Sequence, residues 1–360
     1  MIDFDFERLR ALGLTPAIAS LAAGLPEPDD GPSQLMRLTE VHRESVRLHD
    51  GLGLHNARAA PRLVRVLDDD ETTLAVGDWV LARGGPQTGA IVQALVPRLA
   101  HIARRDADGR RHAVVSNVDT ALLVMGLDDD FNPRRLERYL ALVHGSSVLP
   151  VVVLTKRDVV APATVAAHCA ALQGRIAPAI EVLAVDATDA EAARALAAYT
   201  TTGQTLVLLG SSGAGKSTLT NSMIGAATQD TGAVREQDSR GKHTTTARSL
   251  HCLPGGACVI DTPGLRALRP DVDETTLAAS FADIETLAGR CRFRDCRHYD
   301  EPGCAVRDGI DGDRLHNYPK LLREARRDTL SALERQQQVA QWKARGKATK
   351  AWMKVKRGEA

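Results

Sequence analysis

The sequence predicts a multidomain chain: a small antiparallel β-barrel, a central α/β domain and a C-terminal helical domain that holds a metal. Three observations predict it. Short apolar runs separated by turns fill residues 35–111, long apolar runs alternate with helical segments from Asn117, and cysteines gather near the C-terminus. A chain of 360 residues has room for two or three domains of roughly 100–200 residues each. The expected parts are an N-terminal extension (1–34), the barrel (35–112), the α/β domain (113–272) and the metal-binding domain with its basic tail (273–360).

The first two parts rest on local patterns. Phe6, Leu9 and Leu12 have the spacing of an amphipathic helix, and the breaker-rich LPEPDDGPS follows as a linker. No role for this extension follows from its residues. Beyond it, the apolar runs LVRVL, DWVLA and AIVQAL alternate with turns such as LDDDE and RGGPQTG. Such alternation is typical of a small antiparallel barrel or sandwich.

The third part has a different pattern, in which long apolar runs alternate with helical segments. The buried-strand patterns TALLVMGL, SVLPVVVL, IEVLAVDA and TLVLLG alternate with helical segments around RRLERYLALV, ATVAAHCAAL and AEAARALAAY. Continuous apolar strands that alternate with helices predict a parallel sheet covered on both faces. A helix near residues 274–287 and a long charged helix from about Tyr318 are expected after it.

Composition excludes several classes of protein. No apolar run approaches the roughly 18 residues of a membrane span, and the N-terminus MIDFDFERLR is acidic where a signal peptide would be basic. We therefore expect a cytoplasmic protein without a membrane partner. The net charge of +1 conceals a basic stretch at 341–357, so polyanion binding would be regional.

A phosphate-binding motif follows the strand TLVLLG. The pattern G-x-x-x-x-G-K-[ST] is matched with a strand before it and a helix after it, which is the context that the motif requires. Backbone N–H groups of such a loop point at phosphate oxygens, the lysine neutralises the β- and γ-phosphates, and the serine ligates Mg²⁺. The expected nucleotide-binding residues are Gly210, Ser211, Ser212, Gly213, Ala214, Gly215, Lys216, Ser217 and Thr218.

A candidate base-reading motif precedes that loop. Thr155, Lys156, Arg157 and Asp158 match [NT]-K-x-D at the end of the apolar strand VLPVVVL. A carboxylate at 158 accepts from both N1–H and the exocyclic amine of guanine, and the lysine stem covers the base. Adenine would leave that carboxylate partly unpaired, at a cost of about 1–3 kcal/mol. Taken alone, the motif also fits an ordinary surface loop. Its assignment to guanine recognition therefore depends on the other motifs in the sequence.

Two further motifs lie downstream. Asp261-Thr262-Pro263-Gly264 fits the D-x-x-G turn, with Asp261 directed at Mg²⁺ and the Gly264 N–H at the γ-phosphate. In GKHTTT, either Thr244 or Thr245 is expected to ligate Mg²⁺, although a threonine run also suits local turn bonding. The order of base reader, phosphate loop, threonine switch and D-x-x-G is a rotation of the common one. A doubly wound sheet can be cut and rejoined without moving a site in space, so the order predicts a circular permutation.

Together these motifs resemble the circularly permuted GTPases of the RsgA (YjeQ) family, which depend on the bacterial small ribosomal subunit. The resemblance covers residues 35–324 and includes GDWV, NVD, TKRD, GSSGAGKST, GKHTTT, DTPG and CRFRDCRHYDEPGCAV. It implies an N-terminal OB-fold, a permuted P-loop GTPase domain and a C-terminal zinc domain. It also implies a role in late maturation of the small (30S) subunit. Many members have Ser-Ala where this chain has Asp186-Ala187, so a guanine contact by Asp186 stays open.

The residue after D-x-x-G bears on hydrolysis. Many GTPases place a water-orienting glutamine there, but this chain has Leu265, so slow intrinsic hydrolysis and completion of the site by a partner are expected. Besides Lys216 and Gly264, His243 is the candidate catalytic residue, because an imidazole can donate and accept near neutral pH. An exposed loop histidine without a catalytic role is an equal alternative.

The bunched cysteines predict one structural metal ion. Cys291, Cys296, His298 and Cys304 supply three thiolates and an imidazole, a closed tetrahedral set for Zn²⁺. In a reducing compartment bunched thiols indicate a metal before a disulfide, and no Cys-x-x-Cys pair supports a redox role.

Basic residues point to RNA. Trp342 and Trp352 interrupt the basic tail, which pairs base stacking with phosphate neutralisation, and arginines of the barrel region could add to it. We therefore expect a monomeric GTPase that cycles between GTP and GDP on the small subunit and its 16S rRNA. The alternatives are a GTP-dependent RNA- or ribosome-binding factor with incidental hydrolysis, and an ATP-using protein unrelated to ribosomes. The arginines of the barrel region that could contact RNA are Arg98, Arg104, Arg105, Arg110 and Arg111.

Overall fold

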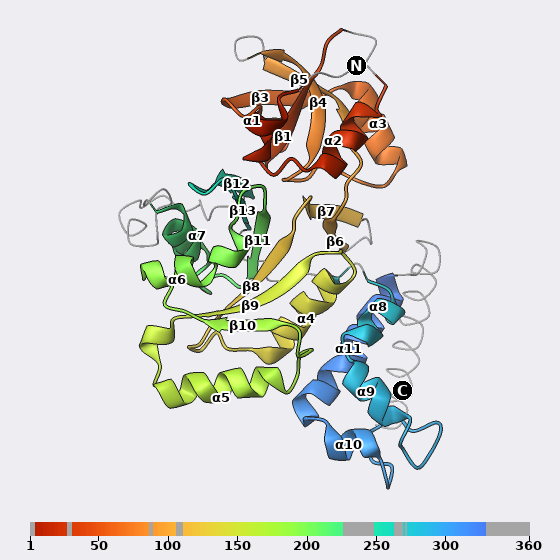
Figure 1. Ribbon diagram of the computed structural model, residues 1–360. Helices are drawn as coiled ribbons and strands as arrows, with labels where there is room; N and C mark the ends of the chain where they lie inside the picture. Colours follow the sequence, from red (N-terminus) through yellow and green to blue (C-terminus); the bar gives the residue numbers. More distant parts are fainter. Residues whose placement is uncertain are drawn as a thin grey trace, which may run out of the picture. The chain divides into compact units, whose positions relative to one another are not determined.

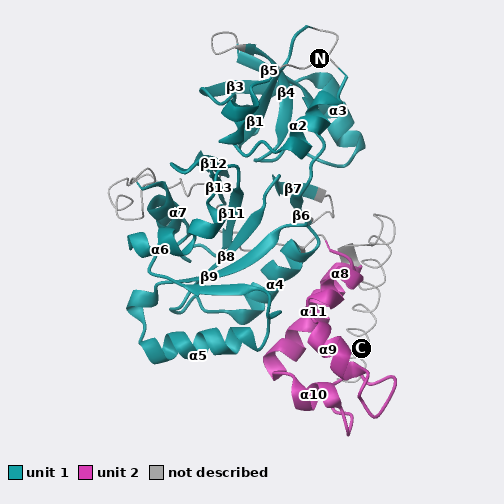
Figure 2. Cartoon of the chain, in the orientation of Figure 1, with its two compact units in different colours: residues 1–104, 111–270 teal, residues 105–110, 271–360 magenta. Residues whose placement is uncertain are grey.

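The computed structural model describes residues 4–26, 31–85, 89–105, 111–225, 248–262, 269–270 and 272–328. The chain divides into two compact units, the first comprising 1–104 and 111–270 and the second 105–110 and 271–360 (Figure 2). The finer division of the first unit into extension, barrel and α/β domain remains a prediction.

A five-stranded barrel opens the first unit (Figure 1). It closes because β1 pairs with both β2 and β4, while β3 and β5 pair in parallel. This strand order, with helix α3 between β3 and β4, is that of the OB-fold and confirms the expected barrel. The strands are β1 (Gln34–Val41), β2 (Val46–His49), β3 (Leu54–Ala59), β4 (Trp79–Gly85) and β5 (Gly89–Leu95).

One strand expected in this region is wrong. The run LVRVL lies inside helix α3 (Pro61–Asp69). Pro61 occupies the first turn, where its missing N–H costs nothing, and Leu63 and Leu67 stand four residues apart on the buried face of the helix. Val64 and Val66 are 42% and 48% exposed, so the run has helical rather than strand periodicity of burial.

The N-terminal segment packs on the barrel. Two short helices, α1 (Phe6–Arg10) and α2 (Pro16–Ala23), are capped by the side chains of Asp5 and Thr15. Their apolar residues share one core with barrel strands, so the segment is part of the fold and the expected linker begins only after α2. That core comprises Leu9, Leu12, Leu14, Ile18, Ala22, Leu35, Trp79, Leu81 and Val96.

The predicted α/β domain is present. Its strands run in the order β10-β9-β8-β11-β13-β12, all parallel except β12, and a pairing of β12 with β1 joins them to the barrel. Leu123 and Met125 of β8 pack in the core with α4, while Leu122 and Val124 face the core of α7. Alternate residues of one strand thus serve two apolar layers, which explains why the strand pattern is continuous.

The elements of this domain follow the sequence closely. The strands are β8 (Thr120–Gly126), β9 (Leu149–Thr155), β10 (Glu181–Ala184), β11 (Thr205–Gly210), β12 (Ser249–Cys252) and β13 (Cys258–Asp261). The helices are α4 (Pro133–His144), α5 (Pro162–Gln173), α6 (Ala190–Ala195) and α7 (Lys216–Ile224), with the 3₁₀ turns η1 (Arg157–Val159) and η2 (Ala197–Tyr199). A small separate sheet is formed by β6 (His101–Arg105), β7 (Arg111–Ser116) and β14 (Arg269–Pro270).

A buried arginine links the barrel to the parallel sheet. Arg37 of β1 is fully buried, lies over the ring of Trp79, and donates to the carbonyl oxygens of Leu12 and Asn117 and to Oγ1 of Thr205. Burial lowers the pKa of its guanidinium. One side chain therefore ties the N-terminal segment, the barrel and β11 together.

The second unit is helical. It contains α8 (Glu274–Ala279), α9 (Ala282–Ala288), α10 (Ala305–Gly309) and α11 (Gly312–Asp328), so the single helix expected near 274–287 is in fact two. Arg314 stacks over Phe281 and pairs with Asp283 at 2.7 Å. The charged helix begins before Tyr318, and the basic tail lies outside the described residues. Across the described ranges, no helix combines the length and apolar character needed to cross a membrane.

Candidate nucleotide and metal sites

Three of the predicted motifs meet at one edge of the parallel sheet. The base-reading motif starts at the end of β9, the phosphate loop at the end of β11, and the D-x-x-G turn at the end of β13. Because these strands are parallel, their carboxyl ends lie on the same side. Ligands of open α/β sheets bind at this edge, so the displaced base-reading motif is at the expected place in space.

The phosphate loop is held by its own backbone. Lys216, 6% exposed at the start of α7, donates from Nζ to the carbonyl oxygens of Gly210 and Ser211 at 3.0 and 2.7 Å. Burial lowers the pKa of its ammonium, while the carboxylates of Asp261 and Asp130 oppose that shift. Gly215 has φ of +87°, and a Cβ there would come within 3.2 Å of Thr155 Oγ1. The loop therefore needs glycine at that position.

A hydrogen bond joins the base-reading motif to the phosphate loop. Thr155, fully buried at the end of β9, donates from Oγ1 to the carbonyl oxygen of Ala214 at 2.6 Å. The two segments are separated by 59 residues in sequence. Threonine at the first position of the motif thus ties the base-reading motif directly to the phosphate loop.

The rest of that motif turns outward. Lys156 has φ of +60° and pairs with Asp128 at 2.6 Å. Arg157 pairs with Glu191 at 2.9 Å. Asp158 is exposed in η1, and no hydrogen-bond partner of its carboxylate is found among the described residues. Its oxygens are thus available to an external donor pair.

Asp186 is occupied by its own turn. Its Oδ1 accepts from the backbone N–H and the hydroxyl of Thr188 at 2.8 and 2.6 Å, and these bonds lower the pKa of the carboxyl. The preceding residue, Val185, accepts from the N–H of Arg157 at 3.3 Å. The Asp-Ala pair therefore lies beside the base-reading motif, with its carboxylate engaged locally.

Two of the expected magnesium ligands come together. Ser217 Oγ lies 3.3 Å from Oδ2 of Asp261. Oδ1 of Asp261 is buried and has no hydrogen-bond partner among the described residues. Burial raises the pKa of this carboxyl, and the nearby ammonium of Lys216 opposes the rise. A carboxylate with one buried, unsatisfied oxygen and the other beside a hydroxyl fits a hard cation such as Mg²⁺.

Sequence reasoning missed two carboxylates at this edge. Asp128 and Asp130 follow β8, where Asp128 pairs with Lys156 and Asp130 accepts from Ser211 Oγ at 2.6 and 2.8 Å. Asp130 also pairs with Arg135 of α4 at 2.5 Å. The signal was the run GLDDD directly after a buried parallel strand, the position where functional side chains collect.

Four predicted site residues lie outside the described residues: His243, Thr244, Thr245 and Gly264. The same holds for Leu265 and for the two tail tryptophans.

Arg98 is not a free RNA-binding residue. It forms a bidentate pair with Asp78 at 2.7 and 2.8 Å, and also donates to Thr72 and Thr73. Asp78 in turn accepts from Ser116 Oγ at 2.5 Å. The bond from Ser116 joins Asp78 of the GDWV motif to β7, the strand that leads into the α/β domain, which gives that motif a structural role.

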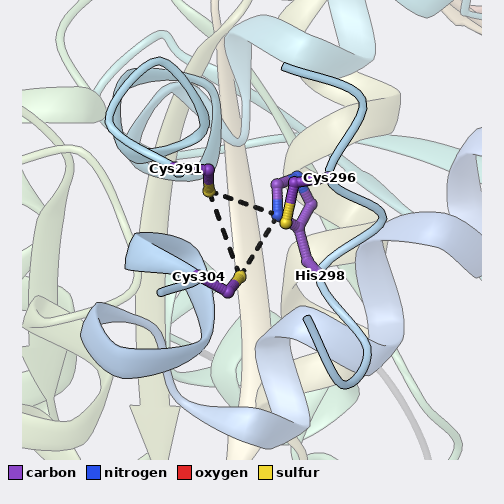
Figure 3. A group of neighbouring side chains, drawn as sticks. All are labelled: Cys291, Cys296, His298 and Cys304. Atoms are coloured by element: carbon purple, nitrogen blue, oxygen red, sulfur yellow. Dashed lines mark hydrogen bonds between the residues drawn. The ribbon is translucent and has the colours of Figure 1, made fainter. Parts of the chain in front are cut away.

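The second unit holds a compact cluster of potential metal ligands (Figure 3). One ligand atom from each of Cys291, Cys296, His298 and Cys304 lies within 4.8 Å of the others. Nδ1 of His298 is 3.7 and 3.4 Å from the sulfurs of Cys291 and Cys304, which are 4.0 Å apart. His298 adopts φ of +62°, in the left-handed region, and its ring lies beside the thiols (Figure 3).

Backbone groups favour a thiolate in this cluster. The N–H groups of Val306 and Ala305, at the start of α10, lower the pKa of the Cys291 thiol. Cys304 is buried at the N-cap of the same helix and accepts from the N–H of Arg307. Metal ligands are commonly oriented by such outer hydrogen bonds, and this cluster can hold one ion.

The fold and sites define a P-loop nucleotide-binding protein with a permuted motif order, an OB barrel and a cysteine-rich unit. Residues 95–270 match the family model described as RsgA GTPase. A Xanthomonas campestris small ribosomal subunit biogenesis GTPase RsgA is 46% identical over 293 residues, 79% of each chain. The Xylella fastidiosa protein of that name is 51% identical over 256 residues, 69% of this chain and 73% of its own.

Solved structures agree with this fold. YjeQ from Thermotoga maritima matches 81% of this chain and 98% of its own with a TM-score of 0.57 at 20% identity. YloQ, described as a circularly permuted GTPase, matches 85% of this chain and 100% of its own with a TM-score of 0.54 at 19% identity. The chain belongs to the RsgA GTPase family.

Proposed function

We propose that this chain hydrolyses GTP to GDP and phosphate in the bacterial cytoplasm, stimulated by the small (30S) ribosomal subunit during its late maturation. The names of the relatives support this proposal, because they describe small ribosomal subunit biogenesis GTPases. The GTP form would bind the subunit as a monomer, and the GDP form would leave.

One observation carries the nucleotide assignment. The bond from Thr155 Oγ1 to the Ala214 carbonyl joins the base-reading motif to the phosphate loop at 2.6 Å. A nucleotide whose phosphates lie on that loop would have its base within reach of Asp158. The exposed carboxylate would accept from guanine N1–H and N2–H₂ together, which adenine cannot offer.

The remaining roles follow from the same edge. Lys216 would move from its carbonyl partners to the β- and γ-phosphates, whose charge repays its burial. Ser217 and Asp261 would hold Mg²⁺, directly and through water, and the ion would neutralise charge on the phosphates. Thr244 or Thr245 as a further ligand, the Gly264 N–H at the γ-phosphate and His243 as the water-positioning residue are proposals from sequence.

We assign Zn²⁺ to the cysteine cluster. Four ligand atoms around one zinc ion lie about 3.5–3.8 Å from one another, close to the 3.4–4.0 Å separations that involve Cys291, His298 and Cys304. Three thiolates and an imidazole leave no position for water, so the ion would be structural. The basic tail with its tryptophans would add contacts to 16S rRNA.

Phosphate release from GTP and from ATP, each with and without purified small subunits, tests the proposal. We expect slow release from GTP alone, a rise of at least about tenfold with subunits, and little release from ATP under either condition. Equal use of both nucleotides would contradict the guanine assignment. Subunit binding that depends on GTP without any stimulation would favour the binding factor with incidental hydrolysis.

A further inference from the structure

Two cysteines outside the metal cluster face each other across a hairpin. Cys252, the last residue of β12, is the register partner of Cys258, the first residue of β13. The N–H of Leu253 donates to the carbonyl oxygen of Ala257 at 2.7 Å, which makes the next pair outward, Cys252 and Cys258, a non-hydrogen-bonded pair. In such pairs the Cα atoms are about 4.5 Å apart and both side chains lie on the same face. This separation is within the range that a disulfide bridges, about 4.4–6.8 Å.

The two thiols have different environments. Cys252 is exposed, whereas Cys258 is buried and its Sγ lies 3.6 Å from the carbonyl oxygen of Ala11. The two residues are cross-strand register partners, so their thiols start from adjacent backbone positions. One residue is thus accessible to a small reagent from solvent, and its register partner is buried.

An incompletely paired cation lies next to both thiols. Among the described residues, the hydrogen-bond acceptors of the buried Arg37 are two carbonyl oxygens and a hydroxyl, and its Nε is buried without a partner. Its positive charge lowers the pKa of both thiols, against the burial that raises it. A thiolate here would supply an anion close to a buried guanidinium, and positive charge next to a thiol is the usual basis of cysteine reactivity.

The acidities of the thiols fit this division. The hydrogen bond from Cys258 lowers the pKa of Cys252 to about 7, with further help from Arg37. The same hydrogen bond and burial raise the pKa of Cys258. Burial also raises the pKa of Cys169, which has no such neighbour and serves as an internal reference.

We propose that Cys252 and Cys258 are a redox-active dithiol that a hydroperoxide oxidises to a cross-strand disulfide. The Cys252 thiolate attacks one peroxide oxygen, the O–O bond breaks, and the leaving oxygen takes a proton, so that the sulfur becomes a sulfenic acid and the peroxide is reduced to water or an alcohol. Cys258 then gives up its thiol proton, its sulfur attacks the sulfenic sulfur, and the S–O bond breaks with release of water.

The experiment treats the full, metal-loaded chain with hydrogen peroxide, alkylates the remaining thiols and maps tryptic peptides by mass spectrometry. Both cysteines fall in the single peptide 249–266, while each cysteine of the metal cluster falls in a different one. We expect this peptide to lose both alkylation sites together and two hydrogens, at least about tenfold faster than Cys169 is oxidised, and to recover both sites with a reducing dithiol.

Two variants separate the steps. In Cys258→Ser, dimedone should trap a sulfenic acid at Cys252, and in Cys252→Ser, Cys258 should stay alkylatable. The proposal is overturned if the peptide keeps both alkylation sites at doses that oxidise Cys169. It is equally overturned if Cys252 proceeds to sulfinic acid while Cys258 remains alkylated.

Discussion

The nucleotide site and the metal cluster are built in opposite ways. At the nucleotide site, the groups that shape the phosphate loop are paired with protein partners: carbonyl oxygens accept from Lys216, Asp130 accepts from Ser211, and Ala214 accepts from Thr155. At the cluster, three sulfurs and a ring nitrogen lie close together in a region of short helices and turns.

The difference teaches where each site gets its stability. The parallel sheet positions the phosphate loop through buried strands such as β8 and β11, whose residues are almost completely buried. The segment around the cluster, residues 289–304 (the knuckle), is mostly exposed, so we expect the free energy that orders it to come from metal binding, about 10–16 kcal/mol for structural zinc in small domains. The nucleotide site should therefore survive loss of its ligand, and the knuckle should not.

The largest expected effect is loss of the metal. Cys304→Ser replaces a buried ligand, and we expect metal content to fall from about one ion per chain to near zero, with protease cleavage appearing within 289–304. Elemental analysis and limited proteolysis measure this. Cys169→Ser, at a cysteine outside the cluster, is the control. If the metal-free chain resists cleavage within 289–304, metal binding does not order this segment, and the contrast with the nucleotide site fails.

The next effect is on phosphate binding. Lys216→Ala removes the buried ammonium without touching the strand that positions it, so the fold should persist while GTP turnover falls by roughly 10²–10³-fold. Steady-state phosphate release and circular dichroism measure the two parts. Lys320→Ala, at an exposed position of α11, should leave both unchanged. If the Lys216 variant unfolds, the fold of the site depends on this side chain and not on the sheet alone.

A smaller effect concerns the base. Asp158→Asn replaces one acceptor of the exposed carboxylate by a donor, so GTP affinity should fall by about 10–100-fold. Xanthosine triphosphate, which carries a carbonyl where guanine has its amine, should recover part of the loss. Competition binding with both nucleotides measures the change in preference from guanosine to xanthosine triphosphate. Asp68→Asn on α3 is the control. Unchanged guanine preference would remove Asp158 from the base site.

Much of this could be predicted from the sequence. The strands around Leu122 and Leu208 are continuous apolar runs, and motif spacing located the loop from Gly210 to Lys216, because both signals are local in the chain. The metal cluster was predictable for the same reason, since its four ligands lie within 14 consecutive positions, 291–304.

The rest depended on contacts that no local pattern records. LVRVL has the apolar content of a strand, and only its packing on the barrel, with Leu63 and Leu67 inward, makes it a helix. Arg98 reads as a surface cation until Asp78, 20 residues earlier, pairs with it. Asp130 joins the phosphate loop from 81 residues away, a distance that only the sheet topology brings to contact.

The smallest effect tests the bond between the two halves of the nucleotide site. Thr155→Val keeps the shape of the side chain but cannot donate to the Ala214 carbonyl, which stays buried without that partner. The lost hydrogen bond should cost about 1 kcal/mol. If the whole cost appears in the binding free energy of GTP, affinity falls roughly fivefold. Fluorescent-nucleotide titration measures GTP affinity. Thermal unfolding of the nucleotide-free protein measures how far the substitution lowers the stability of the fold. Thr155→Ser, which keeps the hydroxyl, should restore affinity. If valine lowers only the unfolding temperature, the bond stabilises the sheet edge but does not align base and phosphate, and the site is less preorganised than its hydrogen bonds indicate.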